Sequence, residues 1–223
     1  MKKLVIVESQ AKAKKIQGFL EKAFPSDSWK VHACLGHVRD LKDDESAVDP
    51  NDWNNLKWES TPKGKKTLKE IRELTKDSSG IYLASDPDRE GEAIAWHILD
   101  HLQDKKLAEG RQINRISFNE ITPSAIKNAI ENPRDIDQFL VEAYLARRVL
   151  DHLIGFKVSP LLWRHVPRAK SAGRVQSPTL RMICSREDEI DAFCAEEFWP
   201  LKVDFKTNCL LYTSDAADDV VGV

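Results

Sequence analysis

The stretch LASDPDREGEAIAWHI, residues 83–98, joins the end of an apolar run to the start of a helical pattern. The run GIYLAS (80–85) is predicted to be a strand, and the apolar residues of REGEAIAWHILDHL (89–102) recur with the spacing of a helix. Asp86, Asp88 and Glu90 occupy every second position at this junction. The stretch therefore predicts a strand followed by a helix, with an acidic triplet where the two meet.

The same alternation of strand and helix extends to both sides of this stretch. Further strands are predicted at residues 3–8, 29–36 and 113–118, and further helices at residues 11–24, 62–77 and 122–132. Pro62, and Thr122 followed by Pro123, are typical of helix starts. This order predicts an α/β fold in which helices flank a parallel sheet.

The pattern changes near residues 133–136, where we place a domain boundary. From residue 136 the sequence has long helical periodicity, and no strand-like run occurs before residues 198–205. Residues 144–186 carry nine Lys and Arg residues and one acid, whereas residues 187–223 carry ten acids and two lysines. A chain of 223 residues can hold one large domain or two modest ones. We expect an α/β domain at residues 1–135 and the beginning of a mostly α-helical domain at residues 136–206.

The overall composition excludes some classes of protein and leaves others open. The 34 Lys and Arg residues nearly balance the 36 Asp and Glu residues, so the net charge argues neither for nor against a polyanionic partner. No window of about 18 apolar residues is present, and the start MKKLVIVESQ lacks the pattern of a signal peptide, which predicts a cytosolic protein without a membrane partner. The four cysteines form no CxxC pair, so neither a disulfide framework nor a zinc site is expected.

The acidic triplet has two explanations. Acids beside a helix start are stabilised by the helix dipole, and this explanation suffices for a single Asp. Three acids at alternate positions repel one another, so a divalent cation with oxygen ligands explains them better. We therefore expect Mg²⁺ at Asp86, Asp88 and Glu90, at the sheet edge where parallel sheets bind ligands. Glu8 ends the first predicted strand and is expected at the same edge, with Lys12 one helical turn beyond it.

Several separated motifs occur in a fixed order along the chain. They are LVIVESQAKAKKI (4–16), LGHVRDL (35–41), DPDREGEAIAWHI (86–98), RISFNEIT (115–122), ARRVLDHLIGFKVSPLLW (146–163) and SAGRVQSPTLRMI (171–183). Together they resemble the type IA DNA topoisomerases of bacteria. The sequence DPDREGEAIAW is most similar to the topoisomerase I branch of that family. The first motif departs from that family at Gln10, where a proline is usual. The resemblance covers residues 2 to about 205 and implies a TOPRIM domain with a Rossmann-like sheet.

The resemblance implies an ATP-independent transesterification that uses Mg²⁺ and no nucleotide cofactor. A tyrosine attacks a DNA phosphodiester, holds the 5′ phosphate covalently while another strand passes, and leaves when the strand is rejoined. Glu8 would assist proton transfer at the 3′ oxygen and face the metal, and Lys12 would neutralise the scissile phosphate. Asp86, Asp88 and Glu90 would hold the metal. The implied substrates are single-stranded and negatively supercoiled DNA, and the implied location is the cytoplasm, in association with the nucleoid.

The resemblance also implies a set of DNA contacts. They are His37, Arg147, Arg148, Asp151, Trp163, Ser171, Gly173, Arg174 and Gln176. From the residues alone, the i, i+4 pair Arg147 and Asp151 is explained equally well as a solvated ion pair or as part of a phosphate clamp. Gly173 permits a close backbone approach, and Arg174 and Gln176 suit phosphate and base or sugar contacts, although an ordinary helix-entry loop gives the same pattern.

Trp163 and the histidines other than His37 are interpreted as structural residues. Trp163 is read first as a core or capping aromatic residue and second as a platform for base stacking, because Arg164 follows it. The other five histidines have no mutual spacing that suits a metal, and we expect them to pack in the core or lie on the surface.

None of the three tyrosines lies in a motif that carries the nucleophile of this family. Tyr82 lies in a predicted buried strand and Tyr144 in a predicted helix. Tyr212 lies in CLLYTSDAADDVVGV (209–223), beyond the end of the resemblance. We interpret residues 207–223 as a foreign or frame-shifted tail, and we expect the chain by itself to be inactive.

Two other functions remain open from the sequence. Primases and certain nucleases carry a similar acid set, but neither explains the motifs ARRVLD and SAGRVQS. A non-catalytic module that binds single-stranded DNA explains the basic motifs, and its binding would need neither the acids nor a metal.

Overall fold

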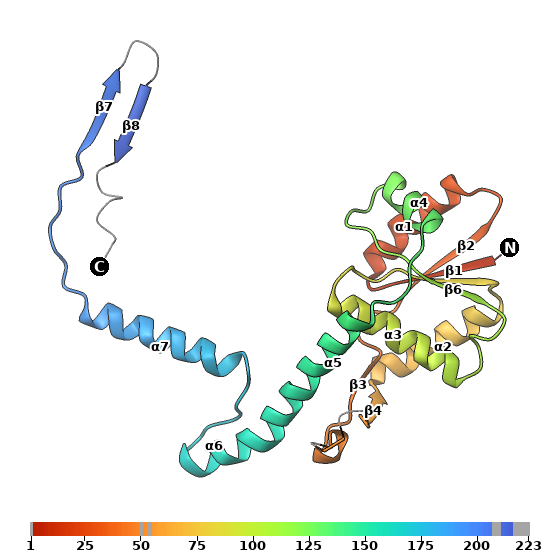
Figure 1. Cartoon of the computed structure of the whole chain (residues 1–223), viewed down its shortest axis with the longest axis horizontal. Coiled ribbons are helices and arrows are strands. Elements are labelled where there is room, and N and C mark those ends of the chain that lie inside the picture. Colours follow the sequence, from red (N-terminus) through yellow and green to blue (C-terminus); the bar gives the residue numbers. More distant parts are fainter. Residues whose placement is uncertain (1, 50, 53–54, 207–210, 216–223) are drawn as a thin grey trace. The chain divides into compact units, whose positions relative to one another are not determined.

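The computed structural model describes residues 2–49, 51–52, 55–206 and 211–215. The chain divides into two compact units, residues 1–174 and 175–223. The first unit contains a four-stranded parallel sheet with the strand order β2, β1, β5, β6 (Figure 1), which confirms the predicted α/β fold. The strands are β1 (Lys2–Val7), β2 (Ser28–Ala33), β5 (Gly80–Leu83) and β6 (Gln112–Arg115).

Four helices cover the two faces of this sheet. They are α1 (Gln10–Ala23), α2 (Pro62–Lys76), α3 (Arg89–Asp104) and α4 (Pro123–Glu131), all within two residues of the predicted bounds. In each first turn a side chain before the helix accepts a hydrogen bond from a backbone amide; the four caps are Ser9, Thr61, Asp88 and Thr122. Helices α1 and α4 pack on one face of the sheet, and α2 and α3 pack on the other (Figure 1).

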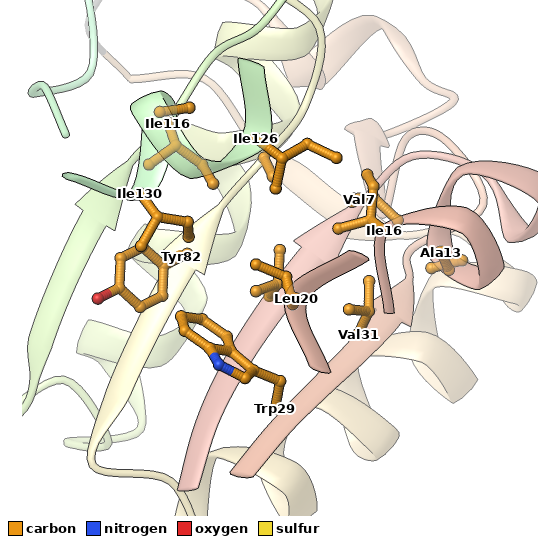
Figure 2. Packing of buried hydrophobic residues seen from close by; sticks show 14 residues of the cluster. Val7, Ala13, Ile16, Leu20, Trp29, Val31, Tyr82, Ile116, Ile126 and Ile130 are labelled. Atoms are coloured by element: carbon orange, nitrogen blue, oxygen red, sulfur yellow. The ribbon is translucent and has the colours of Figure 1, made fainter. Parts of the chain in front are cut away.

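Alternate residues of the strands point into two apolar cores, one on each face of the sheet. On the α1 and α4 side, the core includes Val7, Ile16, Leu20, Trp29, Val31, Tyr82 and Ile126 (Figure 2). On the α2 and α3 side, it includes Leu4, Ile6, Leu68, Ile71, Ile81, Leu83 and Ile98. Burial on both faces explains why the strands read as continuous apolar runs. Each fully buried Leu or Ile contributes about 1.5–3 kcal/mol relative to an exposed one.

A small antiparallel hairpin lies between the strand predicted at residues 29–36 and the helix predicted at residues 62–77, where the sequence predicted no strand. It consists of β3 (Arg39–Leu41) and β4 (Trp58–Ser60), and the short 3₁₀ helix η1 (Glu45–Ala47) lies between them. Leu41, Ala47 and Val48 form a third buried cluster with Val149. Strands of three residues carry too few positions to show an alternating pattern, which explains why the prediction missed them.

A long helical segment follows the sheet, as predicted. It begins at Asp137, whose side chain accepts hydrogen bonds from the amides of Phe139 and Leu140. The segment comprises α5 (Gln138–Leu153), the π-helical turn η2 (Ile154–Val158) and α6 (Ser159–His165). Because α5 packs on α3, it belongs to the same compact unit as the sheet. The boundary near residues 133–136 marks a change in the type of structure within this unit, and as a domain boundary it stays a prediction.

The second unit contains a helix and a pair of antiparallel strands. They are α7 (Gln176–Ala192), β7 (Lys202–Lys206) and β8 (Leu211–Asp215), so β7 lies at the end of the strand predicted for residues 198–205. Residues 207–210 and 216–223 of the predicted tail lie outside the described residues, and the foreign origin of that tail stays a prediction. In the part of the chain that the structure describes, no helix is long and apolar enough to cross a membrane.

Candidate active site

The predicted site lies where the connections of the sheet diverge. β1 leads through α1 to β2 on one side, whereas β5 leads through α3 to β6 on the other side. In open parallel sheets, ligands bind at such a switch point, beyond the carboxyl ends of the strands. Glu8 follows β1 directly, and Asp86 follows β5. Because β1 and β5 are neighbours, with Ile6 opposite Leu83, their ends bring Glu8 and Asp86 together.

Glu8, Lys12 and Asp86 form one polar cluster at this edge. The Asp86 backbone amide donates a hydrogen bond of 2.6 Å to Glu8 Oε1. Lys12 Nζ forms an ion pair with Asp86 Oδ1 and lies 4.0 Å from Glu8 Oε2. Burial raises the pKa of Glu8 above its ordinary value of 4.5, while the hydrogen bond from the Asp86 amide lowers it and the negative charge of Asp86 raises it. A carboxyl group with a raised pKa is suited to carry a proton.

The other two acids of the triplet have different surroundings. Asp88 is the N-cap of α3, and its Oδ1 accepts a hydrogen bond of 2.7 Å from the Gly91 amide, so the capping explanation holds for this residue. Lys12, Asp86 and Asp88 line one hollow of about 430 Å³. Glu90 lines a different pocket, of about 290 Å³. The structure therefore groups Asp86 with Asp88 and with Glu8, but it does not bring Glu90 into the same hollow.

The junction between β5 and α3 needs a glycine. A Cβ atom at Gly91 would lie 2.1 Å from the carbonyl oxygen of Asp86, which is far inside van der Waals contact. The main chain of residues 84–88, which connect β5 to α3 and are called the acidic loop below, thus folds directly onto the first turn of α3.

Glu8 and Asp86 provide a donor set that fits a hard cation. Mg²⁺ usually takes one or two protein carboxylates, keeps several waters and completes its shell with phosphate oxygens. The two carboxylates are close enough for the charge of Asp86 to raise the pKa of Glu8. Among the described residues, however, no group of three or more His, Cys, Asp or Glu side chains is arranged to hold a metal. The residues fit a cation held by two carboxylates, and a preassembled cage of all four predicted acids is not found.

The pocket that contains Glu90 lies against α5. Its walls are His37, Asp40, Arg89, Glu90, Tyr144, Arg147, Arg148 and Asp151. Arg148 donates two hydrogen bonds to the Asp40 carboxylate, at 2.7 and 2.6 Å. The side chains of Arg89 and Arg147 have no hydrogen bond or ion pair with another described residue, so both guanidinium groups of this pocket are available to a phosphate. Three arginines face three carboxylates, which leaves the pocket with little net charge.

Tyr144 is a structural residue of this pocket. Its hydroxyl lies 3.4 Å from His37 Nδ1, and the two rings stack with their centroids 5.4 Å apart. Burial raises the pKa of Tyr144 to about 12, so the phenol stays protonated at neutral pH and is a poor nucleophile. Tyr82 is buried in the core of the sheet, as predicted.

The remaining predicted DNA contacts lie on α5, on α6 and beyond. Arg174 and Asp151 form an ion pair of 2.9 Å, which ties the segment after α6 to α5. Ser171 and Gly173 lie in the same segment as Arg174, and Gln176 is the first residue of α7. Trp163 is exposed and is not a core residue; its Nε1 donates a hydrogen bond of 2.7 Å to the carbonyl of Lys170.

Two charged residues behind the acidic loop were not predicted. The side chains of Glu92 and Arg115 are fully buried and form an ion pair of 2.9 Å. Residues 91–95 of α3 are all buried, so Glu92 stands in a stretch whose pattern indicates only a core helix. Arg115 is the first residue of RISFNEIT, one of the motifs that carry the family resemblance. Its position in that motif is the only signal in the sequence that could have pointed to Arg115.

Comparison with known proteins defines the class of this one. Residues 3–121 match the family model of the Toprim domain, and residues 135–219 match the model described as DNA topoisomerase. The second match extends into the segment predicted to be foreign. Toprim domains generally bind Mg²⁺, which agrees with the donor set at the sheet edge.

Individual relatives show which proteins with a Toprim domain this chain resembles. The chain is 51% identical over 200 residues to DNA topoisomerase 1 of Xylella fastidiosa and 45% identical over 212 residues to that of Zymomonas mobilis. These matches cover 90% and 95% of this chain but only 24% and 17% of the two relatives. Full-length topoisomerase I from Thermotoga maritima has a similar fold, with a TM-score of 0.71 and 41% identity, over 90% of this chain and 32% of its own length. The chain therefore belongs to the type IA DNA topoisomerases and carries their Toprim domain, as its motifs predicted.

Proposed function

We propose that this chain forms the Mg²⁺-binding and DNA-contacting part of a type IA topoisomerase. The complete protein would cleave, pass and rejoin single strands, and would thereby relax negatively supercoiled DNA without ATP. The observation that supports the proposal most strongly is the pairing of Glu8 with Asp86, beside Lys12, at the switch point of the sheet. Glu8 as a proton carrier, the Lys12 ammonium group, and a metal held by Glu8 and Asp86 would together suit chemistry at a phosphodiester.

In this proposal, Glu8 and Asp86 hold Mg²⁺, with Asp88 reaching it directly or through water. When bound, the metal supplies positive charge to the phosphate oxygens. Lys12 lies beside Asp86 and is the proposed neutralising partner of the scissile phosphate. Glu90, in the neighbouring pocket, is proposed as a more distant member of the acid set.

The proposed reaction exchanges one phosphodiester for another. A tyrosine hydroxyl loses its proton as its oxygen bonds to the scissile phosphorus, the bond from phosphorus to the 3′ oxygen breaks, and the 3′ oxygen takes up a proton. Rejoining reverses each change. Glu8, whose pKa is raised by burial, is the proposed donor and acceptor of that proton. Tyr82 and Tyr144 are buried, and Tyr212 lies among Asp215, Asp218 and Asp219 in the sequence, whose charges would repel a phosphate. The attacking hydroxyl is therefore proposed to come from a part of the protein outside this chain.

We further propose that a single DNA strand runs from Glu8 and Asp86, called the acid pair below, past the pocket on α5. Arg147 is the proposed primary phosphate contact, and His37 and Arg148 are proposed to flank it. Other contacts are proposed at Asp151, Trp163, Ser171, Gly173, Arg174 and Gln176. A cytoplasmic location in association with the nucleoid follows from this substrate. The match of residues 135–219 to a DNA topoisomerase model counts against a primase or a nuclease, which would have no use for that region.

Isothermal titration of Mg²⁺ tests the acid pair. The change is Glu8→Gln or Asp86→Asn, and either is expected to weaken Mg²⁺ binding at least about tenfold because each removes one of two charged ligands. The control is Asp77→Asn, an exposed acid just before the opposite end of β5, which pairs with Lys2. Equal Mg²⁺ affinity in the wild type and the three variants would contradict the proposal. Single-stranded DNA binding that is unchanged by EDTA and by loss of the acids would also contradict it, because a non-catalytic binding module needs neither.

A further inference from the structure

Arg115 is a buried guanidinium that faces the main chain of the acidic loop. Its side chain has no exposed surface. It donates hydrogen bonds to three carbonyl oxygens at the end of β5, those of Leu83 at 3.0 Å, Ser85 at 2.7 Å and Asp86 at 2.8 Å. It also donates to the carbonyl of Ile116. One side chain thus binds three of the four residues by which the chain leaves the sheet and enters the site.

The carbonyls of Ser85 and Asp86 need the guanidinium because the chain has left the regular sheet, whereas the Leu83 carbonyl also accepts a hydrogen bond from the Ile116 amide. Buried carbonyl groups require hydrogen-bond partners, and past Leu83 the parallel ladder no longer supplies them. A guanidinium offers five donors in a fixed planar fork, whereas a lysine offers three donors from a single point. The arrangement therefore fixes the direction of several peptide groups at once, including the peptide that follows Asp86.

Glu92 neutralises Arg115 and connects it to the next helix. Its Oε1 accepts from Arg115 Nε at 3.0 Å and also forms an ion pair with Arg134. Its Oε2 accepts from the backbone amide of Asp137, the residue that caps α5. A buried ion pair adds little stability by itself, because the cost of removing both charges from water offsets their attraction. Its effect here is to hold the guanidinium against the acidic loop.

We propose that Arg115 is a positioning residue for the acid pair: by holding the carbonyls of Ser85 and Asp86, it keeps the Asp86 amide on Glu8 and the Asp86 carboxylate beside Lys12. The consequence for Mg²⁺ rests on the proposed function, but the consequence for the Asp86 amide does not. Arg115 acts through Asp86 and touches neither a substrate nor the metal.

Arg134 provides a matched control. Like Arg115, it is an arginine that pairs with Glu92, but its side chain donates to no carbonyl of the acidic loop; its other partners are the Ser117 hydroxyl and the Asp135 carbonyl. A purely structural role for the buried charges predicts similar effects of Arg115→Lys and Arg134→Lys. A positioning role predicts different effects at Asp86.

The test is amide hydrogen exchange by NMR in the metal-free chain, followed by titration with Mg²⁺ alone. In Arg115→Lys, exchange of the Asp86 amide is expected to be about tenfold faster, the factor that corresponds to loss of one hydrogen bond, while the amides of β1 keep their protection. Mg²⁺ affinity is expected to fall by a similar factor. In Arg134→Lys, both quantities are expected to stay at their wild-type values.

A double variant tests whether fast exchange of the Asp86 amide results merely from unfolding of the chain. Glu92→Met/Arg115→Met replaces the buried pair by apolar side chains of similar length, an exchange that often preserves or raises stability. It is expected to melt near the wild-type temperature and still show fast Asp86 exchange and weak Mg²⁺ binding. Wild-type exchange of Asp86 in both Arg115→Lys and the double variant would overturn the proposal. If the wild type itself binds no Mg²⁺, the proposed function fails, and the exchange of Asp86 still decides the role of Arg115.

Discussion

His97 is a fully buried histidine with no hydrogen-bond partner on either ring nitrogen among the described residues. Its ring packs against Trp58 and Trp96, with centroids 4.6 and 4.8 Å away. Burial, with smaller contributions from the charges of Arg39 and His37, lowers its pKa from 6.5 to about 3. The folded protein therefore holds His97 neutral at pH values where the unfolded chain binds a proton.

This residue is expected to make the fold sensitive to acid. Between about pH 6.5 and pH 3 the unfolded state binds one more proton at His97 than the folded state, so the free energy of unfolding falls as the pH falls, by up to about 1.4 kcal/mol per pH unit. Urea unfolding at pH 7.0, 5.5 and 4.5 measures the slope. His97→Phe is expected to flatten it, and His165→Phe, at an exposed site, to leave it unchanged. The same slope in wild type and His97→Phe would contradict this assignment.

Arg147 and Asp40 make opposite predictions for DNA binding. Arg147→Ala removes one of the two unpaired guanidinium groups of the pocket, so it is expected to weaken binding of a single-stranded oligonucleotide and to flatten the log–log salt dependence by roughly 0.7. Asp40→Asn releases Arg148 from its counter-ion and is expected to strengthen binding at low salt. Fluorescence anisotropy measures both, with Lys105→Ala, at the far end of α3 from Glu90, as the control. Unchanged affinity and slope in Arg147→Ala would show that the basic residues between positions 144 and 186 form only a solvated surface.

Residue types in the sequence indicated the chemistry of the site but not all of its partners. Glu8 and Asp86 could be predicted to meet because each follows a strand of one parallel sheet, and strand ends share an edge. Asp40 could not be predicted as the partner of Arg148, since 108 positions separate them. The ion pair of Glu92 and Arg115 was equally hidden, because a buried charge has no periodic signature.

Helix α3 connects the fold to the site through its first turn. Asp88 caps this helix and also lines the hollow that contains Asp86 and Lys12. A capping role and a metal-binding role for one side chain can be separated by a pair of substitutions, because asparagine caps helices as well as aspartate does but carries no charge.

Asp88→Ala is expected to lose about 1 kcal/mol of stability with its cap, whereas Asp88→Asn is expected to keep the stability within a few tenths of a kcal/mol. Both are expected to weaken Mg²⁺ binding if the carboxylate reaches the metal. Thermal unfolding and Mg²⁺ titration of the two variants provide the measurement. Full Mg²⁺ affinity in Asp88→Asn would restrict this residue to capping.

The elements of the sheet could be predicted because both of its faces are buried, which produces apolar runs bounded by polar turns. Helix starts were equally clear, since Pro62 and Pro123 fit a first turn and Thr122 is a typical cap; the cap Thr61 was found only in the structure. The hairpin of β3 and β4 was missed because its apolar cluster is completed by Val149, which lies about 90 positions beyond β4 in the sequence.

The whole chain spans a quarter or less of the length of the two relatives compared with it. The acid pair, Lys12 and the arginines of α5 form only part of the proposed site. We therefore expect the chain alone to bind single-stranded DNA but neither to cleave nor to relax negatively supercoiled plasmid in Mg²⁺. Electrophoresis after a denaturant quench measures this, and a topoisomer ladder or a covalent protein–DNA adduct from the chain alone would be the opposite result.

The most direct measurement uses a chimera in which residues 1–206 replace the matching region of the Xylella fastidiosa DNA topoisomerase 1. We predict that this chimera relaxes negatively supercoiled plasmid in Mg²⁺ without ATP. The same chimera with Asp86→Asn or Lys12→Ala is predicted to relax it roughly 100-fold more slowly or not at all. The Asp77→Asn chimera, altered at the opposite end of β5, is predicted to keep the parent rate. Equal relaxation rates in the parent, Asp86→Asn and Lys12→Ala chimeras would contradict the claim that this sheet edge is the site of the reaction.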